Sequence, residues 1–257
     1  MRDVTFPAAE TNFPGMDVLL DFPPAQAERG SPLRRQSCFP KPAGSPQGMV
    51  DLPAIHLEPV PAEALARLLD LLVCGEEAAS IAFDGLAEAS ACNPDATAAL
   101  RRIADEERGH EGLIKALAGK LPAVPDEAGL LAAARRFHIH LGRGDQATHL
   151  ARIAALDSAV CTLLARLLRP ASPLAGDAVV GAVLRRIGRD EARHVRVSRT
   201  LACAGRDPRI LRTMAAPARE ALVKLLVLAA DDFEKLECDP DRLFRDLARL
   251  PDGLFGV

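Results

Sequence analysis

The sequence predicts an all-α protein whose main part is a four-helix bundle, with extra C-terminal helices and a proline-rich N-terminal arm. Three observations lead to this prediction. Apolar residues recur at helical spacing from Pro61 onward, and no segment alternates apolar and polar residues as a half-buried strand does. Capping residues followed by proline divide this part into long helical segments. One long connection separates the second segment from the third, as in bundles with a crossover.

Residues 1–60 are predicted to form an arm distinct from the helical domain at 61–257. Half of the chain's 20 prolines lie in this arm, and proline fixes φ and removes a hydrogen-bond donor. Extended or disordered chain is therefore expected. Two interpretations stay open: the arm is disordered or loosely docked, or its phenylalanines anchor it on the bundle or on a partner. These phenylalanines form the pairs Phe6-Pro7, Phe13-Pro14, Phe22-Pro23 and Phe39-Pro40.

The first two predicted helices form one pair. The first runs from Pro61 to about Glu88. Asn93 followed by Pro94 is a helix-start signal, and it begins the second helix, which ends near Gly119. The apolar face of the first helix consists of Leu65, Leu69, Leu72, Val73 and Phe83.

The third and fourth predicted helices form a second pair. The connection that leads to them spans 120–144 and holds a helix of its own at 130–141. The third helix is expected over 145–168 and the fourth over 172–205. Short links within each pair and one crossover between the pairs describe a ferritin-like bundle.

Two further helices follow the four. Asp207-Pro208 begins a fifth helix, which is apolar nearly all round at 222–230, and Asp239-Pro240 begins a short last one. Because exposure of its apolar surface to water is unfavourable, the fifth helix is expected to pack against the outside of the four bundle helices or at a subunit contact.

Two Glu-x-x-His pairs lie at the centres of the second and fourth helices. They are Glu107 with His110, and Glu191 with His194. Residues three apart leave one face of a helix together, and here that face is otherwise apolar. A buried carboxylate is costly unless it is paired, hydrogen-bonded or bound to a metal. The two pairs together therefore predict a metal site inside the bundle.

The first and third helices are expected to complete this site with one acid each. In the first helix Glu76 shares the apolar face, whereas Glu77 falls toward a more polar side, so Glu76 is the predicted ligand. In the third helix the central acid is Asp157. Four carboxylates and two imidazoles suit two divalent first-row ions, either iron or manganese, and suit zinc less well.

Two strings carry a resemblance to known families. The segment from Gly75 to Phe83 resembles the pattern of rubrerythrin and demethoxyubiquinone hydroxylase, in which a ligand Glu follows Gly. The string Asp190-Glu191-Ala192-Arg193-His194 is similar to the fingerprint of bacterial multicomponent monooxygenases, acyl desaturases and ribonucleotide reductase small subunits. The second helix departs from that fingerprint, because Gly109 stands where it has Arg. The resemblance covers roughly residues 61–203.

This resemblance implies partners for the two histidines. Asp190 would hold His110 and Glu106 would hold His194, which fixes the tautomer of each ring. Arg193 is expected to form an ion pair beside them. Asp157 replaces the usual Glu, and its shorter reach makes that metal position weaker or more open. The chain has no Tyr, which excludes a tyrosyl-radical generator.

Three more residues are candidates for a substrate pocket beside the metals: Phe83, Cys161 and His149. An ordinary core cysteine and a surface histidine are the alternatives for the last two. His138 and His140 are two positions apart and cannot share a helix face, so no second metal site is expected there.

The function expected from these features is that of a non-haem dimetal oxidase or oxygenase, with two iron ions (a manganese–iron or manganese pair being the other options). It would use O2 and a small organic substrate, draw electrons from a separate reductase or ferredoxin, and form a homodimer. Two alternatives remain: a ferroxidase or peroxide scavenger, and a metal-free helical interaction protein. A net charge of -3 does not favour nucleic acid as a partner, and the apolar runs are too short for a membrane span or a signal peptide. A cytoplasmic location is therefore expected.

Overall fold

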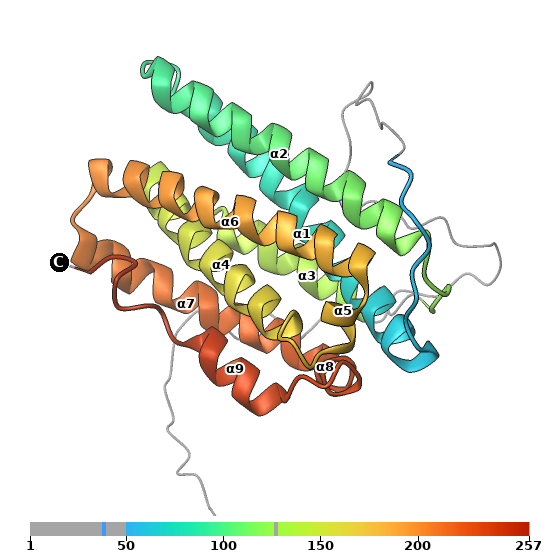
Figure 1. Ribbon diagram of the computed structural model, residues 1–257. Coiled ribbons are helices and arrows are strands. Elements are labelled where there is room, and N and C mark those ends of the chain that lie inside the picture. The colour runs from blue at the N-terminus through green and yellow to red at the C-terminus, as the bar shows by residue number, and fades with distance from the viewer. Residues whose placement is uncertain (1–37, 40–49, 126–127, 257) are drawn as a thin grey trace, which may run out of the picture. The chain divides into compact units, whose positions relative to one another are not determined.

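The computed structural model describes residues 38–39, 50–125 and 128–256, and this part of the chain is helical with no strand (Figure 1). Most of the predicted arm at 1–60 lies outside the described residues. The helices are α1 Pro59–Ala89, α2 Pro94–Ala118, α3 Ala128–Leu141, α4 Gln146–Leu167, α5 Pro173–Gly176, α6 Ala178–Gly205, α7 Pro208–Leu226, α8 Ala230–Lys235 and α9 Pro240–Ala248, with a 3-10 turn at Val227–Ala229.

The capping residues set the helix starts that the sequence predicts. The side chain of Asn93 accepts the N–H of Ala96 at the start of α2, and that of Asp145 accepts the N–H of Thr148 at the start of α4. Each such bond satisfies a backbone donor that has no partner inside the helix. Asp207 and Asp239 cap α7 and α9 in the same way.

The fourth predicted helix differs from the structure, because it is divided into the short α5 and the long α6. The carboxylate of Asp177 causes the division: it accepts the N–H groups of Val179 and Val180 and so begins a new helix. Its other oxygen accepts the N–H of His56, at 2.6 Å, which ties the chain before α1 to the start of α6. Residues 50–58 are not helical, and α1 begins at Pro59.

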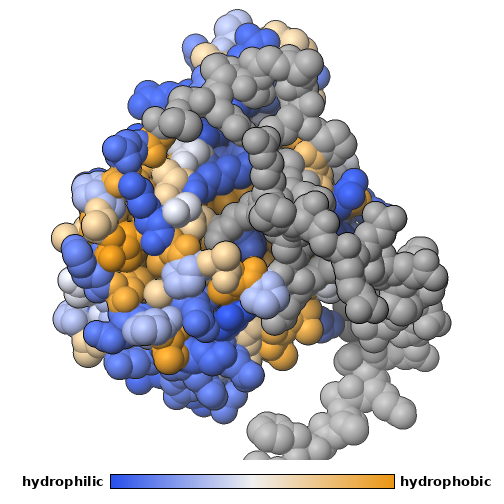
Figure 2. Space-filling model, turned by 90° about the vertical axis from the view of Figure 1, so that its right-hand side faces the viewer, coloured by the Kyte–Doolittle hydropathy of each residue, from blue (hydrophilic) through white to orange (hydrophobic). Residues whose placement is uncertain are grey.

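The helices pack as two pairs, with α1 along α2 and α4 along α6, and α2 also contacts α6 (Figure 1). The crossover helix α3 packs against α1 and α7. The fifth predicted helix, α7, lies outside the four long helices and packs on α4, and α9 covers α7. No helix in the described part is long and apolar enough to cross a membrane. On the face drawn in Figure 2, small apolar groups interrupt a largely hydrophilic surface.

The buried apolar residues in the described part of the chain form two clusters, one toward each end of the bundle. One contains Leu69 and Leu184, and the other contains Phe83 and Leu150. The buried acids and histidines of the central turns lie between these clusters in the sequence of every long helix. Burial of aliphatic side chains on both sides stabilises the bundle and keeps water away from the polar layer.

Glu77 is buried, and this is a second difference from the sequence analysis. Its carboxylate accepts the N–H of Cys38 at 2.7 Å and the N–H of Phe39 at 3.4 Å, and the ammonium of Lys115 lies 3.1 Å away. These partners come from distant parts of the chain, so helix periodicity alone does not reveal them. Cys38 and Phe39 are thus held against α1 by the carboxylate of Glu77.

Candidate metal centre

Six predicted ligand residues lie together at the middle of the bundle, and all of them are buried. They are Glu76 from α1, Glu107 and His110 from α2, Asp157 from α4, and Glu191 and His194 from α6. Each stands on the inward face of its helix, next to apolar residues that hold it there.

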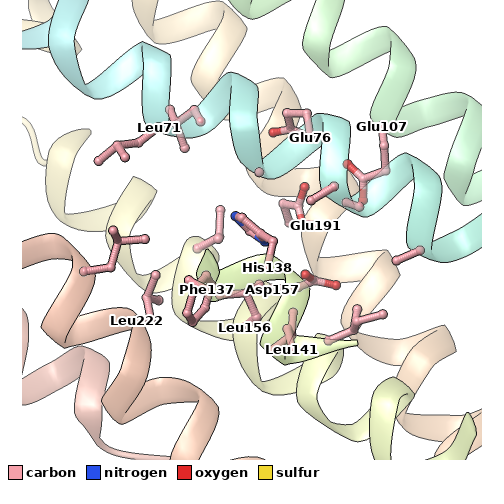
Figure 3. A pocket seen from close by; sticks show the side chains of 18 of the residues that line it. Leu71, Glu76, Glu107, Phe137, His138, Leu141, Leu156, Asp157, Glu191 and Leu222 are labelled. Atoms are coloured by element: carbon pink, nitrogen blue, oxygen red, sulfur yellow. The ribbon is translucent and has the colours of Figure 1, made fainter. Parts of the chain in front are cut away.

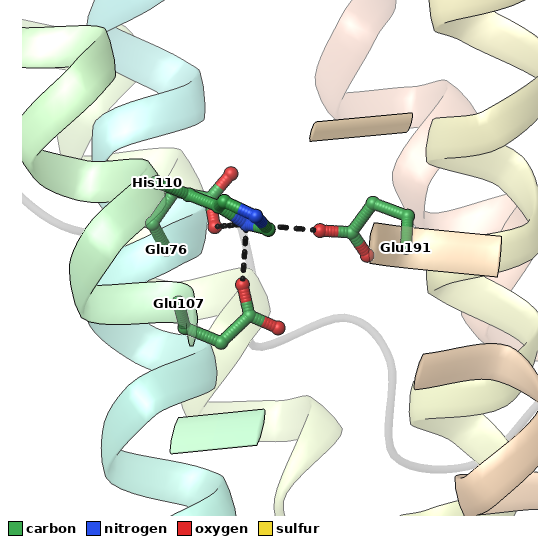
Figure 4. Close-up of side chains that lie close together, drawn as sticks. All are labelled: Glu76, Glu107, His110 and Glu191. Carbon is green, nitrogen blue, oxygen red and sulfur yellow. Dashed lines mark hydrogen bonds and ion pairs between the residues drawn. The ribbon is translucent and has the colours of Figure 1, made fainter. Parts of the chain in front are cut away.

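The first group of ligand atoms surrounds Nδ1 of His110 (Figure 4). Oε2 of Glu107 lies 3.2 Å from this nitrogen, Oε2 of Glu76 lies 3.4 Å from it, and Oε1 of Glu191 lies 3.6 Å from it. One ligand atom from each of these four residues lies within 4.8 Å of the other three. Three carboxylates and one buried imidazole, supplied by three helices, therefore converge on the space around Nδ1 of His110.

The second group consists of Asp157, Glu191 and His194, whose ligand atoms also lie within 4.8 Å of one another. Oδ2 of Asp157 is buried and has no hydrogen-bond partner among the described residues. Nδ1 of His194 lies 3.0 Å from Oε1 of Glu107, but the two atoms are not aligned for a hydrogen bond. Buried polar atoms left without a partner are rare in proteins, and both of these point at the same cluster.

Glu191 belongs to both groups. Glu107 belongs to the first group, but like Glu191 it turns one oxygen toward each imidazole. Glu107 places Oε2 near His110 and Oε1 near His194, at 3.2 Å and 3.0 Å. Glu191 places Oε1 near His110 and Oε2 near His194, at 3.6 Å and 3.8 Å. Both carboxylates therefore face the two imidazoles at once.

The outer nitrogen of each histidine meets an acid of the opposite helix. Nε2 of His110, on α2, lies 3.2 Å from Oδ2 of Asp190, on α6. Nε2 of His194, on α6, lies 3.0 Å from Oε2 of Glu106, on α2. Arg193 lies within 3.1 Å of both acids. With a proton on each Nε2, both rings direct the lone pair of Nδ1 into the cluster.

The electrostatics of the cluster follow from burial and from the crowding of carboxylates. Burial and the charge of neighbouring acids raise the pKa of Glu76 and of Asp157 well above the usual range. Burial alone would raise the pKa of Glu107, but the two imidazoles outweigh it and lower the pKa to about 2. Burial alone would lower the pKa of His194, but the acids beside it raise it to about 11. The cluster therefore favours positive charge, from protons or from cations.

A cavity of about 110 Å³ adjoins the four acids (Figure 3). Its apolar walls come from α1, α3, α4 and α7, whereas α2 and α6 contribute Glu107 and Glu191. Lining residues include Leu71, Phe137, Leu156, Val160 and Leu222, together with the acids Glu76, Glu107, Asp157 and Glu191. The crossover helix α3 and the outer helix α7 thus close the space beside the cluster.

Of the three pocket candidates from the sequence, His149 lines this cavity. Phe83 does not line it, because its ring packs edge-on against the ring of His194, with centroids 6.1 Å apart. Cys161 does not line it either: its Sγ faces the carbonyl of Gly188, and burial raises its pKa to about 12. Sequence reasoning missed His138, which does line the cavity; its apolar neighbours Phe137 and Leu141 were the available signal.

The donor set and its surroundings fit divalent cations. Carboxylate oxygens and imidazole nitrogens are suitable ligands for iron and manganese. No family model matches the chain, and no curated protein matches it.

Proposed function

We propose that the chain is a ferritin-like, non-haem dimetal oxidase or oxygenase, in which the six central residues hold two iron ions. The observation that carries the proposal is the pair of overlapping ligand groups, which share Glu191 and are buried in a layer between two apolar clusters. Two divalent cations would balance the four carboxylates of the layer, which burial otherwise makes costly.

When bound, such a metal pair supplies redox chemistry with O2. The chain's own residues hold the pair in place: Asp190 and Glu106 orient the imidazoles, and Glu107 and Glu191 each face both of them. The leucines and Phe137 of the cavity wall exclude water from the reacting molecule. Electrons come from a separate reductase or ferredoxin, since the sequence contains no motif for a flavin or an iron–sulfur cluster.

The cavity favours a small organic substrate over iron handling as the function of this centre. An iron-storing or iron-oxidising site needs a hydrophilic path for cations, whereas leucine, valine and phenylalanine dominate this lining. Two alternatives serve as outcomes of the test. An iron-handling bundle would oxidise Fe²⁺ with no organic co-substrate, and a metal-free bundle would bind fewer than one ion per four chains.

Anaerobic loading with Fe²⁺, followed by elemental analysis and measurement of O2 uptake, tests the proposal. The wild type is expected to retain about two ions per chain and to consume O2. Glu107→Ala and His194→Ala are expected to lose both properties. Asp105→Ala is the matched control, because Asp105 lies on α2 but is exposed.

Circular dichroism shows whether each variant remains helical, and Asp157→Asn supplies a second, gentler change in the same centre. Full metal loading in helical Glu107→Ala and Asp157→Asn proteins would refute the ligand assignment. The chain contains no Tyr or Trp, so an absorption band that appears in the near ultraviolet after loading reports mainly on the metals.

A further inference from the structure

His138 brings a polar side chain from the crossover helix into the cavity. In Figure 3 its ring lies between the acids Glu76, Glu191 and Asp157 on one side and Leu71 and Leu222 on the other. His140, two residues further along α3, is exposed, and its Nδ1 bonds to the carbonyl of Arg136 in its own helix. The two histidines of α3 therefore face different surroundings.

Neither ring nitrogen of His138 has a hydrogen-bond partner in the described part of the chain. The ring packs edge-on against Phe137, with centroids 4.9 Å apart. On its other side it faces the backbone of α1 at Gly75, where an added methyl group would come no closer than 3.9 Å to Cε1 and Nε2. Because residue 75 has no side chain, space remains beside Nε2. The side chain is half-buried, and its ring nitrogens are open to a molecule that enters the cavity.

Desolvation also sets the chemical form of this half-buried ring. It lowers the pKa of His138 to about 4, so the imidazole is neutral under ordinary conditions. A neutral imidazole has one N–H donor and one nitrogen acceptor. Such a group bonds to a hydroxyl or carbonyl oxygen without bringing a charge into the apolar cavity.

The rest of the cavity sets the size and polarity of the partner. Its volume, about 110 Å³, is below that of the engineered ~150 Å³ cavity that binds benzene, so it suits a molecule of about one small ring. Apart from the acids and histidines, aliphatic and aromatic side chains form the wall. The acids would be neutralised by bound cations, which leaves no charge for an ionic ligand to pair with.

We propose that His138 is a substrate-binding residue, and that the cavity takes a compact, uncharged, mostly apolar molecule whose single hydroxyl or carbonyl oxygen hydrogen-bonds to this ring. The inference rests on the proposed function for the reaction that follows, whereas binding itself needs only the cavity and the imidazole. His138 thereby positions the apolar part of the molecule against the four acids.

Cyclopentanol and cyclopentane test this proposal, because they differ only by the hydroxyl group. Calorimetric titration of the full chain, metal-free and zinc-loaded, gives the affinity for each probe. The wild type is expected to prefer cyclopentanol by about fivefold to tenfold, the usual contribution of one hydrogen bond. His138→Leu should remove this preference and leave cyclopentane binding within about twofold. His140→Leu, on the exposed face of the same helix, should keep the preference.

Several results would overturn the proposal. Equal affinity of the wild type for the two probes, or no binding of either, would do so. A preference that survives in His138→Leu would show that another group holds the hydroxyl. If His138→Leu does not fold, His138→Gln replaces it and should keep part of the preference. Failure of the proposed function would give a different result from failure of the His138 proposal. The protein would not retain iron, but metal-free protein would still prefer cyclopentanol.

Discussion

The imidazole rings of His110 and His194 lie 5.9 Å apart, centroid to centroid, and both direct Nδ1 at the carboxylates of Glu107 and Glu191. Each ring is also held at Nε2 by an acid from the opposite helix. The orientation of both rings is therefore fixed by α2 and α6 together. Under the proposed function, a centre built in this way would need little rearrangement to hold cations.

Removal of an outer acid is expected to weaken metal binding without abolishing it. Glu106→Ala and Asp190→Ala each free one imidazole to rotate or to change tautomer, and the expected loss of metal affinity is about 10-fold to 100-fold. Competition with a chelator of known affinity measures this loss. Asp105→Ala changes the neighbouring acid, which pairs only with exposed Arg108, and should leave the affinity unchanged. Equal affinity in all three variants would contradict the assigned role.

The stability of the metal-free protein is expected to fall as pH rises from about 5.5 to 8. The pKa values of Asp157 and Glu76 are raised in the folded state, so above the usual carboxyl range the folded chain binds more protons than the unfolded chain. His194 acts in the same direction: its contribution is complete below the unfolded pKa of about 6.5 and is lost as pH approaches 11. Glu107, with its lowered pKa, contributes fully throughout this range.

Cations displace these protons, so zinc-loaded protein should lack this decline, and the rise in Tm caused by zinc should increase with pH. Thermal unfolding of metal-free and zinc-loaded protein at several pH values measures the difference. Parallel curves for the two forms would show that the buried acids and histidines do not exchange protons for cations.

Phe83→Ala is expected to lower the free energy of unfolding by about 3–5 kcal/mol, since the ring is fully buried and its loss leaves a cavity. The same change removes the edge-on support of His194, so metal affinity should fall as well. Ile81→Ala is the control on the same helix, because Ile81 is 48% exposed, and it should change stability by less than about 0.5 kcal/mol. Urea unfolding of the metal-free variants measures these free energies. Similar losses of stability in Phe83→Ala and Ile81→Ala would contradict the prediction.

Arg219 is expected to be essential for the docking of α7 on α4. Its buried guanidinium donates to the carbonyls of Leu247 and Ala155 and to the hydroxyl of Ser158. Arg219→Met would leave these acceptors without a donor and should cost about 3 kcal/mol. Arg212→Met, which removes a surface pair with Asp252, should cost less than about 1 kcal/mol. Urea unfolding measures the loss of stability in both variants. A smaller loss in Arg219→Met than in Arg212→Met would contradict this role of Arg219.

Local signals were enough to predict most of the helices. Asn93, Asp145, Asp207 and Asp239 each begin a helix, because a short polar side chain there satisfies backbone N–H groups whatever the rest of the chain does. The division at Asp177 was missed, since the proline at 173 is an equally good helix start and only the capping geometry separates the two.

The candidate site likewise contains residues that local signals predict and residues whose position depends on tertiary packing. Glu107, His110, Glu191 and His194 could be predicted to lie together, because their spacing and apolar helix faces are local properties. Glu77 could not be placed, since its partners Lys115 and Cys38 are distant in the sequence. The cavity-facing position of His138 also depends on how the crossover helix packs, which periodicity does not encode.

The crossover helix has one more consequence. The six central residues come from α1, α2, α4 and α6, whereas the wall that carries His138, Phe137 and Leu141 comes from α3, in the connection between the helix pairs. Substitutions in this connection can reshape the chamber while the ligand-bearing helices keep their sequence. Under the proposed function, substrate selectivity could therefore be redesigned in α3 without changing the six central residues.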